Sequence, residues 1–200
     1  MRIGVTSMKK VFNYFSDLIQ RRFSKSIPTT EDSMRYTFFH SLIVKGGYRP
    51  EDIVLEQSYT NPKFKGSKLD LYAVSKNKTM SAAFEFKYHR GNVAGYTSKA
   101  GELFWDIAKL ANFKAKSKFI VYLTDENMKK YLTNPRNKHD WFSLAVDNSV
   151  IIDNDYACKY PKSLTIWIDG DNYINKCRLR LCFQSVLPKS HCLKIYEIED

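Results

Sequence analysis

Alternating hydrophobic and polar positions predict two adjacent β-strands near the middle of the chain. They cover Lys68–Val74 and Ala82–Tyr88, and a polar linker short enough for a hairpin turn connects them. Side chains two apart on a strand lie on the same face of a sheet. Asp70 on the first strand and Glu85 on the second can therefore share one face, with Lys87 beside them.

Periodicity also predicts the elements around this pair of strands. Apolar residues recur at helical spacing in four segments, which are 7–23, about 29–46, about 98–113 and 125–132. Strand patterns cover 52–59, 118–124, 164–169, 177–183 and 192–198. The second helix has a clear start at Thr29–Asp32, where a threonine cap precedes two acids, and Gly46 and Gly47 form a clear stop.

The order of these elements predicts an α/β (α+β) fold in a single domain, 1–200. Over 29–132 the order is helix, strand, strand, strand, helix, strand, which predicts a central mixed sheet, since a helical crossover joins parallel neighbours. We expect the helix 7–23 and the β-rich extension 133–200 to be peripheral. The alternation places Arg178 and Arg180 on one strand face, which fits a ribbon in a DNA groove, or else a sheet extension or dimer-forming hairpin with a solvated basic face.

Asp70, Glu85 and Lys87 form a chemically suggestive set. Two carboxylates can bind a hard divalent cation such as Mg²⁺, which polarises a phosphoryl oxygen and lowers the pKa of a bound water. A nearby lysine can orient or deprotonate that water or stabilise developing charge. The same three residues also fit an ordinary cross-strand charge pair on an exposed sheet face.

At these positions, and in the order of its elements, the chain resembles the PD-(D/E)xK nuclease superfamily, although Leu69 stands where that family often has proline. The resemblance implies a restriction-endonuclease-like αβββαβ core and a metal-dependent DNA endonuclease. Asp70, Glu85 and the carbonyl of Phe86 would bind Mg²⁺, with Lys87 assisting the attacking water. No small-molecule cofactor is implied.

Two further acids are candidates for the same site. Glu31 is aligned with the apolar stripe of its helix, and in many members of the resembled superfamily a glutamate of this helix joins the active site. A first-turn acid that complements the helix dipole is the alternative. Glu56, near the middle of the strand 52–59, could complete a second metal site or be a solvated strand residue.

The charge favours a polyanionic partner. Lys and Arg number 32 against 21 Asp and Glu, which gives a net charge of +11. Some basic residues lie in loops or helices near the predicted site, and we expect them to contact double-stranded DNA: Lys63, Lys65, Lys68, Arg90, Lys99 and Lys109. Lys99 and Lys109 belong to the helix 98–113, on which we expect both lysines, Glu102 and Asp106 to lie mainly opposite the buried stripe. The ordinary alternative to DNA contact by these two lysines is an ion pair with an acid of the same helix.

The four cysteines lie in the last quarter of the chain. A zinc site built from Cys177, Cys182, His191 and Cys192 matches no standard spacing, so reduced and mostly buried thiols are the simpler interpretation. No segment has the length of a membrane span or the pattern of a signal peptide. We therefore expect a cytoplasmic protein.

These observations favour a type II restriction endonuclease that acts as a homodimer on a short palindrome. A structure-specific resolvase or repair nuclease of the same fold is the first alternative. A non-catalytic nucleic-acid-binding module comes from a different class and would not need Asp70, Glu85 and Lys87 at this spacing. An RNA-processing enzyme remains open, and a membrane-surface protein is the weakest hypothesis.

Overall fold

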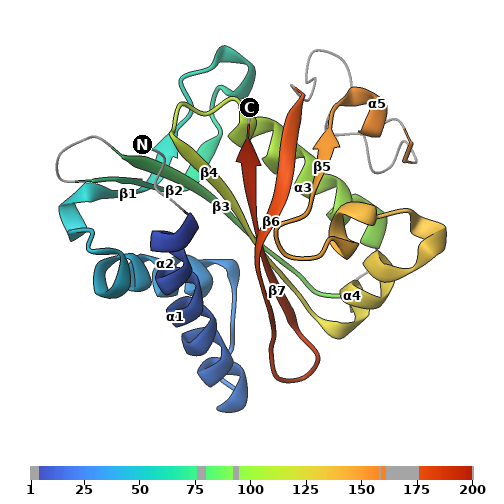
Figure 1. Ribbon diagram of the computed structural model, residues 1–200, viewed down its shortest axis with the longest axis horizontal. Coiled ribbons are helices and arrows are strands. Elements are labelled where there is room, and N and C mark those ends of the chain that lie inside the picture. The colour runs from blue at the N-terminus through green and yellow to red at the C-terminus, as the bar shows by residue number, and fades with distance from the viewer. Residues whose placement is uncertain (1–4, 76–79, 92–94, 158, 161–175, 200) are drawn as a thin grey trace.

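A seven-stranded open sheet forms the centre of the computed structural model, which describes residues 5–75, 80–91, 95–157, 159–160 and 176–199 (Figure 1). Its strands are β1 (Ile53–Ser58), β2 (Lys68–Val74), β3 (Ser81–His89), β4 (Ser117–Thr124), β5 (Ser149–Ile152), β6 (Cys177–Val186) and β7 (Cys192–Glu199). Their spatial order is β1-β2-β3-β4-β7-β6-β5. Strands β3 and β4 are parallel and the other neighbours are antiparallel, so the sheet is mixed, as predicted.

Helices cover both faces of this sheet. They are α1 (Val5–Ser24), α2 (Glu31–Gly46), α3 (Tyr96–Ala111), α4 (Glu126–Thr133) and α5 (Asn154–Ala157). The paired helices α1 and α2 pack on one face, whereas α3 connects β3 to β4 across the other (Figure 1). The described chain thus contains the predicted order α2, β1, β2, β3, α3, β4. None of its described helices combines the length and apolar character needed for a bilayer crossing.

Two hydrophobic cores follow from the alternation along the strands. Phe84 and Phe86 of β3 face α1 and α2, where they meet the Phe38 ring at centroid distances of 4.8 and 5.3 Å. Ala83 faces the opposite core, with α3. Since side chains alternate, β3 directs Glu85 and Lys87 towards α3.

Helix α2 has a well-defined first turn because a capping box fixes it. Ser33 N–H donates to Thr30 Oγ1 at 3.1 Å, and Thr30 N–H donates to Ser33 Oγ at 2.8 Å. At the other end Gly47 adopts a φ of 71°, a left-handed conformation that favours glycine. The residues of the first turn, Glu31 among them, therefore have a fixed position relative to the sheet.

The C-terminal strands belong to the central sheet. Strand β7 pairs with both β4 and β6, and its residues Cys192–Ile198 are buried, whereas we expected 133–200 to be peripheral. Arg180 of β6 forms ion pairs with Glu197 and Glu199, which fits the sheet-extension alternative. The strand predicted at 164–169 lies outside the described residues.

The described cysteines are buried free thiols, in agreement with the simpler prediction. They are Cys177, Cys182 and Cys192, while Cys158 lies outside the described residues. Burial raises the pKa of Cys182 to about 12, and its thiol donates to the Ile195 carbonyl. His191, part of the alternative zinc set, stacks on Phe23 at a centroid distance of 4.2 Å.

Candidate active site at the separation of two strands

Asp70 lies where β2 and β3 separate. The backbone pairing of the two strands runs from Val74 and Ser81 to Leu71 and Phe84. Beyond that point the Asp70 side chain takes over as acceptor, and the Phe86 N–H donates to its Oδ2 at 2.7 Å. The Asp70 carboxylate is thereby held in place while 28% of its side chain stays exposed.

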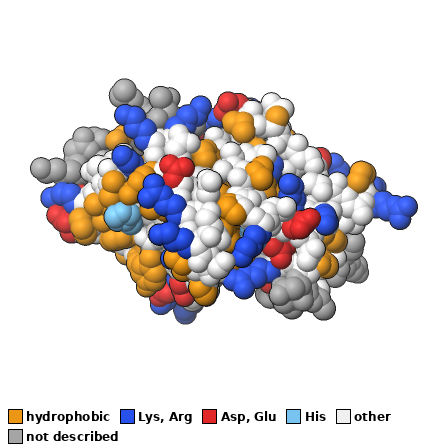
Figure 2. Space-filling model, turned by 90° about the horizontal axis from the view of Figure 1, so that it is seen from below, with side chains coloured by type: hydrophobic (Ala, Val, Ile, Leu, Met, Phe, Trp, Pro, Cys, Tyr) orange, Lys and Arg blue, Asp and Glu red, His pale blue; other side chains and the backbone are white. Residues whose placement is uncertain are grey.

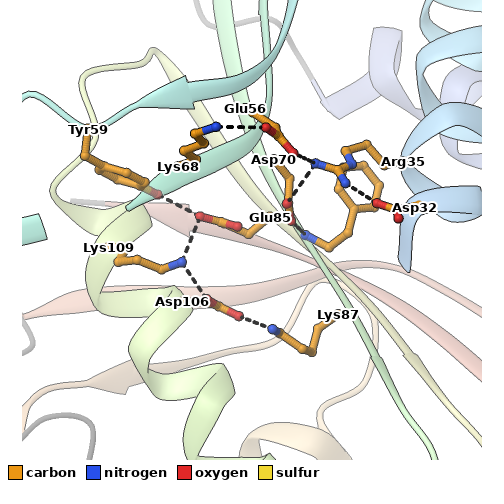
Figure 3. A network of polar contacts seen from close by, with 11 residues as sticks. Asp32, Arg35, Glu56, Tyr59, Lys68, Asp70, Glu85, Lys87, Asp106 and Lys109 are labelled. Atoms are coloured by element: carbon orange, nitrogen blue, oxygen red, sulfur yellow. Dashed lines mark hydrogen bonds and ion pairs between the residues drawn. The ribbon is translucent and has the colours of Figure 1, made fainter. Parts of the chain in front are cut away.

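Glu85 lies beside Asp70 but deeper, with 4% of the residue exposed. The Tyr59 hydroxyl donates to Glu85 Oε1 at 2.8 Å, and Lys109 Nζ lies 3.3 Å from the same oxygen (Figure 3). Burial and, next, repulsion from Asp106 raise the pKa of Glu85 well above its ordinary value, and the attraction of Lys109 offsets only part of this rise. This carboxyl therefore gains from any further cation placed next to it.

A row of charge pairs joins β3 to α3. Lys87 Nζ lies 3.2 Å from Asp106 Oδ2, and Lys109 Nζ lies 2.8 Å from Asp106 Oδ1 (Figure 3). Two residues further along β3, His89 Nε2 lies 3.4 Å from Glu102 Oε2, and burial lowers the pKa of this imidazole. Alternate residues of β3 thus meet successive turns of α3, which explains why so many charged groups occupy this layer.

This arrangement corrects the predicted orientation of α3. Asp106 and Lys109 are 4% and 8% exposed, so they face the sheet instead of lying opposite the buried stripe. Lys109 also makes the intrahelical pair with Asp106 that was the ordinary alternative. It is enclosed between two carboxylates and does not present its charge to an external nucleic acid, contrary to our expectation.

Lys87 is a cation in this setting. Burial alone lowers the pKa of its ammonium group, but attraction to Asp106 and to Glu31 outweighs burial, and the net pKa is raised. Its side chain keeps 19% of its surface exposed. Lys87 can therefore reach a solvent-side ligand while it remains protonated.

Glu31 reaches the sheet from the first turn of α2, as its alignment with the apolar stripe predicted. The Tyr88 N–H donates to Glu31 Oε1 at 3.1 Å. Burial raises the pKa of Glu31, and Lys87 opposes this rise. Asp70, which also raises that pKa, is therefore close enough to act on Glu31 electrostatically.

Arg35, one helical turn after Glu31, is a site residue that the sequence reasoning missed. Its Nη1 lies 3.5 Å from Asp70 Oδ1 and 3.5 Å from Glu56 Oε1, and Asp32 pairs with its other terminal nitrogen (Figure 3). The i, i+4 spacing from Glu31 was the available signal, because it places both residues on one face of the helix. Tyr59 and Asp106 were missed as well.

Glu56 lies at the exposed margin of the site. Its φ is 55°, unusual for a residue other than glycine, and its carboxylate pairs with Lys68 Nζ at 3.0 Å. Hydrogen bonding to Lys68 lowers the pKa of Glu56. Arg35 pairs with both Glu56 and Asp70, and no ion pair or hydrogen bond joins Glu56 to Glu85 in the described part of the chain.

The other basic residues that we expected to contact DNA lie on two segments, of which one leads into β2 and the other follows β3. Lys63, Lys65 and Lys68 are exposed on the segment that leads into β2. The Arg90 guanidinium lies 4.7 Å from the centroid of the Tyr88 ring and donates to the Thr29 carbonyl. Lys99 Nζ donates to the Arg90 carbonyl at 2.6 Å.

The donor set fits a hard divalent cation in chemical type. No group of three or more His, Cys, Asp or Glu side chains suited to a metal ion occurs among the described residues. Mg²⁺, however, commonly uses one or two carboxylates and keeps several waters. Asp70 and Glu85 supply two such groups, each oriented by a hydrogen bond from the protein.

Comparison with known proteins gives no family for this chain. No family model matches it, and no significant match was found among curated proteins or solved structures.

Proposed function

We propose that this chain is a Mg²⁺-dependent endonuclease that hydrolyses phosphodiester bonds in DNA, with a restriction-endonuclease-like core of the PD-(D/E)xK type. The observation that carries the proposal is that Asp70 and Glu85 lie close enough to interact electrostatically where β2 and β3 separate, with Lys87 two residues after Glu85 and held by Asp106. Glu31 joins them from α2, as the resemblance implied for a glutamate of that helix.

Asp70 and Glu85, together with the carbonyl of Phe86, are the groups that would hold the ion. When bound, Mg²⁺ supplies a Lewis acid and lowers the pKa of a coordinated water. The Phe86 N–H fixes the Asp70 carboxylate, and the Tyr59 hydroxyl fixes that of Glu85. This prior orientation reduces the reorganisation required during the reaction.

Lys87 acts as a positive charge and not as a general base. Its raised pKa keeps it protonated at neutral pH, so it orients the attacking water or stabilises the charge that develops on the phosphoryl oxygens. Asp106 is a positioning residue, because its Oδ2 holds the Lys87 ammonium at 3.2 Å. A deprotonating role for Lys87 fits this environment poorly.

The substrate class follows from charge. The chain carries a net charge of +11, and Lys63, Lys65 and Arg90 are exposed, so they are available to contact the backbone of double-stranded DNA. Within this proposal the finer assignment is a type II restriction endonuclease that acts as a homodimer on a short palindrome. A resolvase or repair nuclease would use the same residues on a branched or damaged substrate.

A second candidate, a non-catalytic nucleic-acid-binding module, is favoured by one specific observation. Arg35 lies 3.5 Å from Asp70, and Lys109 lies 3.3 Å from Glu85, so each carboxylate has a cationic partner within the chain. In such a module these pairs would be permanent and structural. In an enzyme, Mg²⁺ has to compete with both side chains.

Cleavage assays separate the two. Supercoiled plasmid and a synthetic four-way junction are each incubated with the protein in Mg²⁺, in Ca²⁺ or in EDTA. A nuclease cuts only with an active metal: discrete plasmid fragments identify a restriction enzyme, and cleavage confined to the junction identifies a resolvase. Binding of both DNAs without cutting in any metal overturns the enzyme and supports the module.

A further inference from the structure

A groove between α1 and α2 lies outside the candidate active site. It has a volume of about 540 Å³ and is formed by the last turns of α1 and the first half of α2. On the face seen in Figure 2, Lys and Arg side chains lie next to hydrophobic ones. The proposed hydrolysis uses none of the residues that line the groove.

The groove is positively charged. Arg21, Arg22 and Lys25 line it, and no Asp or Glu is among its lining residues in the described structure. Within that same part of the chain, neither Arg21 nor Lys25 forms an ion pair with an acid. Arg22 Nη2 donates to the Pro28 carbonyl at 2.6 Å, while its Nε is buried without a hydrogen-bond partner. These cations are suited to an anionic ligand.

An exposed aromatic side chain accompanies the cations. Tyr36 of α2 is 59% exposed and Ile27 is 41% exposed, and both line the groove. A large apolar side chain left in water beside unpaired cations is the combination on which single-stranded nucleic acid binds, with bases stacked on the ring and phosphates on the basic groups.

The groove connects to the candidate active site through the segment between α1 and α2. Arg22 contacts this segment at Pro28, Arg90 contacts it at Thr29, and Lys189 Nζ lies 3.4 Å from Ser26 Oγ. The next residue, Thr30, caps the helix that carries Glu31 and Arg35. Basic side chains thus follow one path from the site, over this segment, into the groove.

We propose that the groove between α1 and α2 binds a single-stranded segment of nucleic acid, with phosphates on Arg21, Arg22 and Lys25 and a base stacked on Tyr36. This second binding site goes beyond the proposed hydrolysis, and its occupancy does not require cleavage. A second copy of this chain is the less favourable occupant, because a two-fold interface would oppose the same three cations to one another.

The test measures binding without chemistry. Fluorescence anisotropy of labelled dT12 and rU12 is recorded with the full chain in EDTA, over a series of salt concentrations. The variants are Tyr36→Phe, Tyr36→Leu, and the double variant Arg21→Gln with Lys25→Gln. The matched control is Lys9→Gln with Lys10→Gln, which removes two exposed charges from the same helix outside the groove.

We expect Tyr36→Leu to weaken binding about tenfold and Tyr36→Phe to leave it unchanged, because stacking needs the ring and not the hydroxyl. The groove double variant should reduce the slope of log affinity against log salt by about 1.4, and the Lys9 and Lys10 control should have a smaller effect. A preference between dT12 and rU12 would identify the kind of single strand.

Three results would overturn the proposal. These are no binding of either oligonucleotide, equal effects of groove and control variants, or equal competition by a poly-glutamate peptide of the same charge. A change of oligomeric state on Tyr36→Leu, measured by sedimentation, would instead assign the groove to a second copy. Because the assay contains no metal, it succeeds or fails independently of the cleavage assays.

Discussion

The Asp70 carboxylate and the Phe86 backbone N–H are joined at 2.7 Å where β2 and β3 separate. This hydrogen bond ties a side chain of one strand to the backbone of the next beyond the last paired residues, Leu71 and Phe84. One acid therefore closes the end of a β-ladder and also presents its other oxygen to the candidate site.

This dual role predicts different effects for two substitutions of Asp70. Asp70→Asn keeps an acceptor for the Phe86 N–H, so we expect the free energy of unfolding to be unchanged. Asp70→Ala leaves that N–H unpaired and should cost about 1 kcal/mol. Urea unfolding checks both values. Equal stability of the two variants would contradict the structural role of the hydrogen bond.

Asp106→Asn tests the positioning of Lys87. Attraction to Asp106 raises the pKa of Lys87, so its loss should lower that pKa and move the alkaline limb of the rate–pH profile to lower pH, with a slower rate. Glu126→Gln is the matched control, because it removes an exposed acid that pairs with Lys130 at 2.9 Å. An unshifted profile in Asp106→Asn would show that Lys87 does not govern that limb.

Lys109→Met tests whether an internal cation competes with metal. The substitution removes the ammonium group that pairs with the buried Glu85 and Asp106, and we expect the unfolding free energy to fall by about 3 kcal/mol. Mg²⁺ should then raise the melting temperature more in this variant than in the unsubstituted chain. Lys130→Met, at an exposed position, should change neither the unfolding free energy nor the response to Mg²⁺. If Mg²⁺ raises the melting temperature of Lys109→Met no more than that of the unsubstituted chain, an ion next to Glu85 is contradicted.

Glu85→Gln should change how stability depends on pH. Because burial raises the pKa of Glu85 above 4.5, its contribution to stability is complete below that pH and is lost as the pH rises towards the folded-state pKa. The variant should therefore gain stability relative to the unsubstituted chain as pH increases above 4.5, measured by urea unfolding in EDTA. Glu56→Gln should show its effect below 4.5 instead: Lys68 lowers the pKa of Glu56, so the contribution of Glu56 is complete above 4.5 and is lost as the pH falls towards the folded-state pKa.

Gly91→Ala tests the packing just beyond β3. A Cβ at this position would lie 2.3 Å from Asn127 Cβ and 2.7 Å from Met128 N, so the backbone of α4 would have to move. We expect a loss of about 2 kcal/mol by thermal or urea unfolding. Gly47→Ala is the comparison: nothing lies within 4 Å of the added atom there, and only its positive φ opposes the change.

Local patterns were sufficient to predict much of the sheet and part of the site. Alternation predicted β2 and β3, and it placed Glu85 and Lys87 on the face of β3 opposite Phe84 and Phe86. The Thr30 cap and the helical stripe placed Glu31 against the sheet, where it accepts from Tyr88. These features depend on residues close in sequence, whose geometry the backbone period fixes.

The missed features depend on contacts between distant segments. Charged residues are rarely buried unless paired, so Asp106 and Lys109 were placed on the exposed side of α3; only their partners on β3 make burial acceptable. Strand β7 alternates like an edge strand, and nothing local indicates that it pairs with both β4 and β6. Arg35 of α2 was missed because its partners Glu56 and Asp70 lie on β1 and β2, far from it in the sequence.

The most direct test of the central claim is the rate of Mg²⁺-dependent plasmid cleavage by four chains purified in parallel. These are the unsubstituted protein, Asp70→Asn, Lys87→Ala and, as an exposed acid outside the site, Glu126→Gln. We predict that Asp70→Asn and Lys87→Ala lose at least roughly 100-fold in rate while they still bind DNA, and that Glu126→Gln retains most of its activity. Equal cleavage by all four chains, or none by the unsubstituted protein in any divalent metal, would contradict the account.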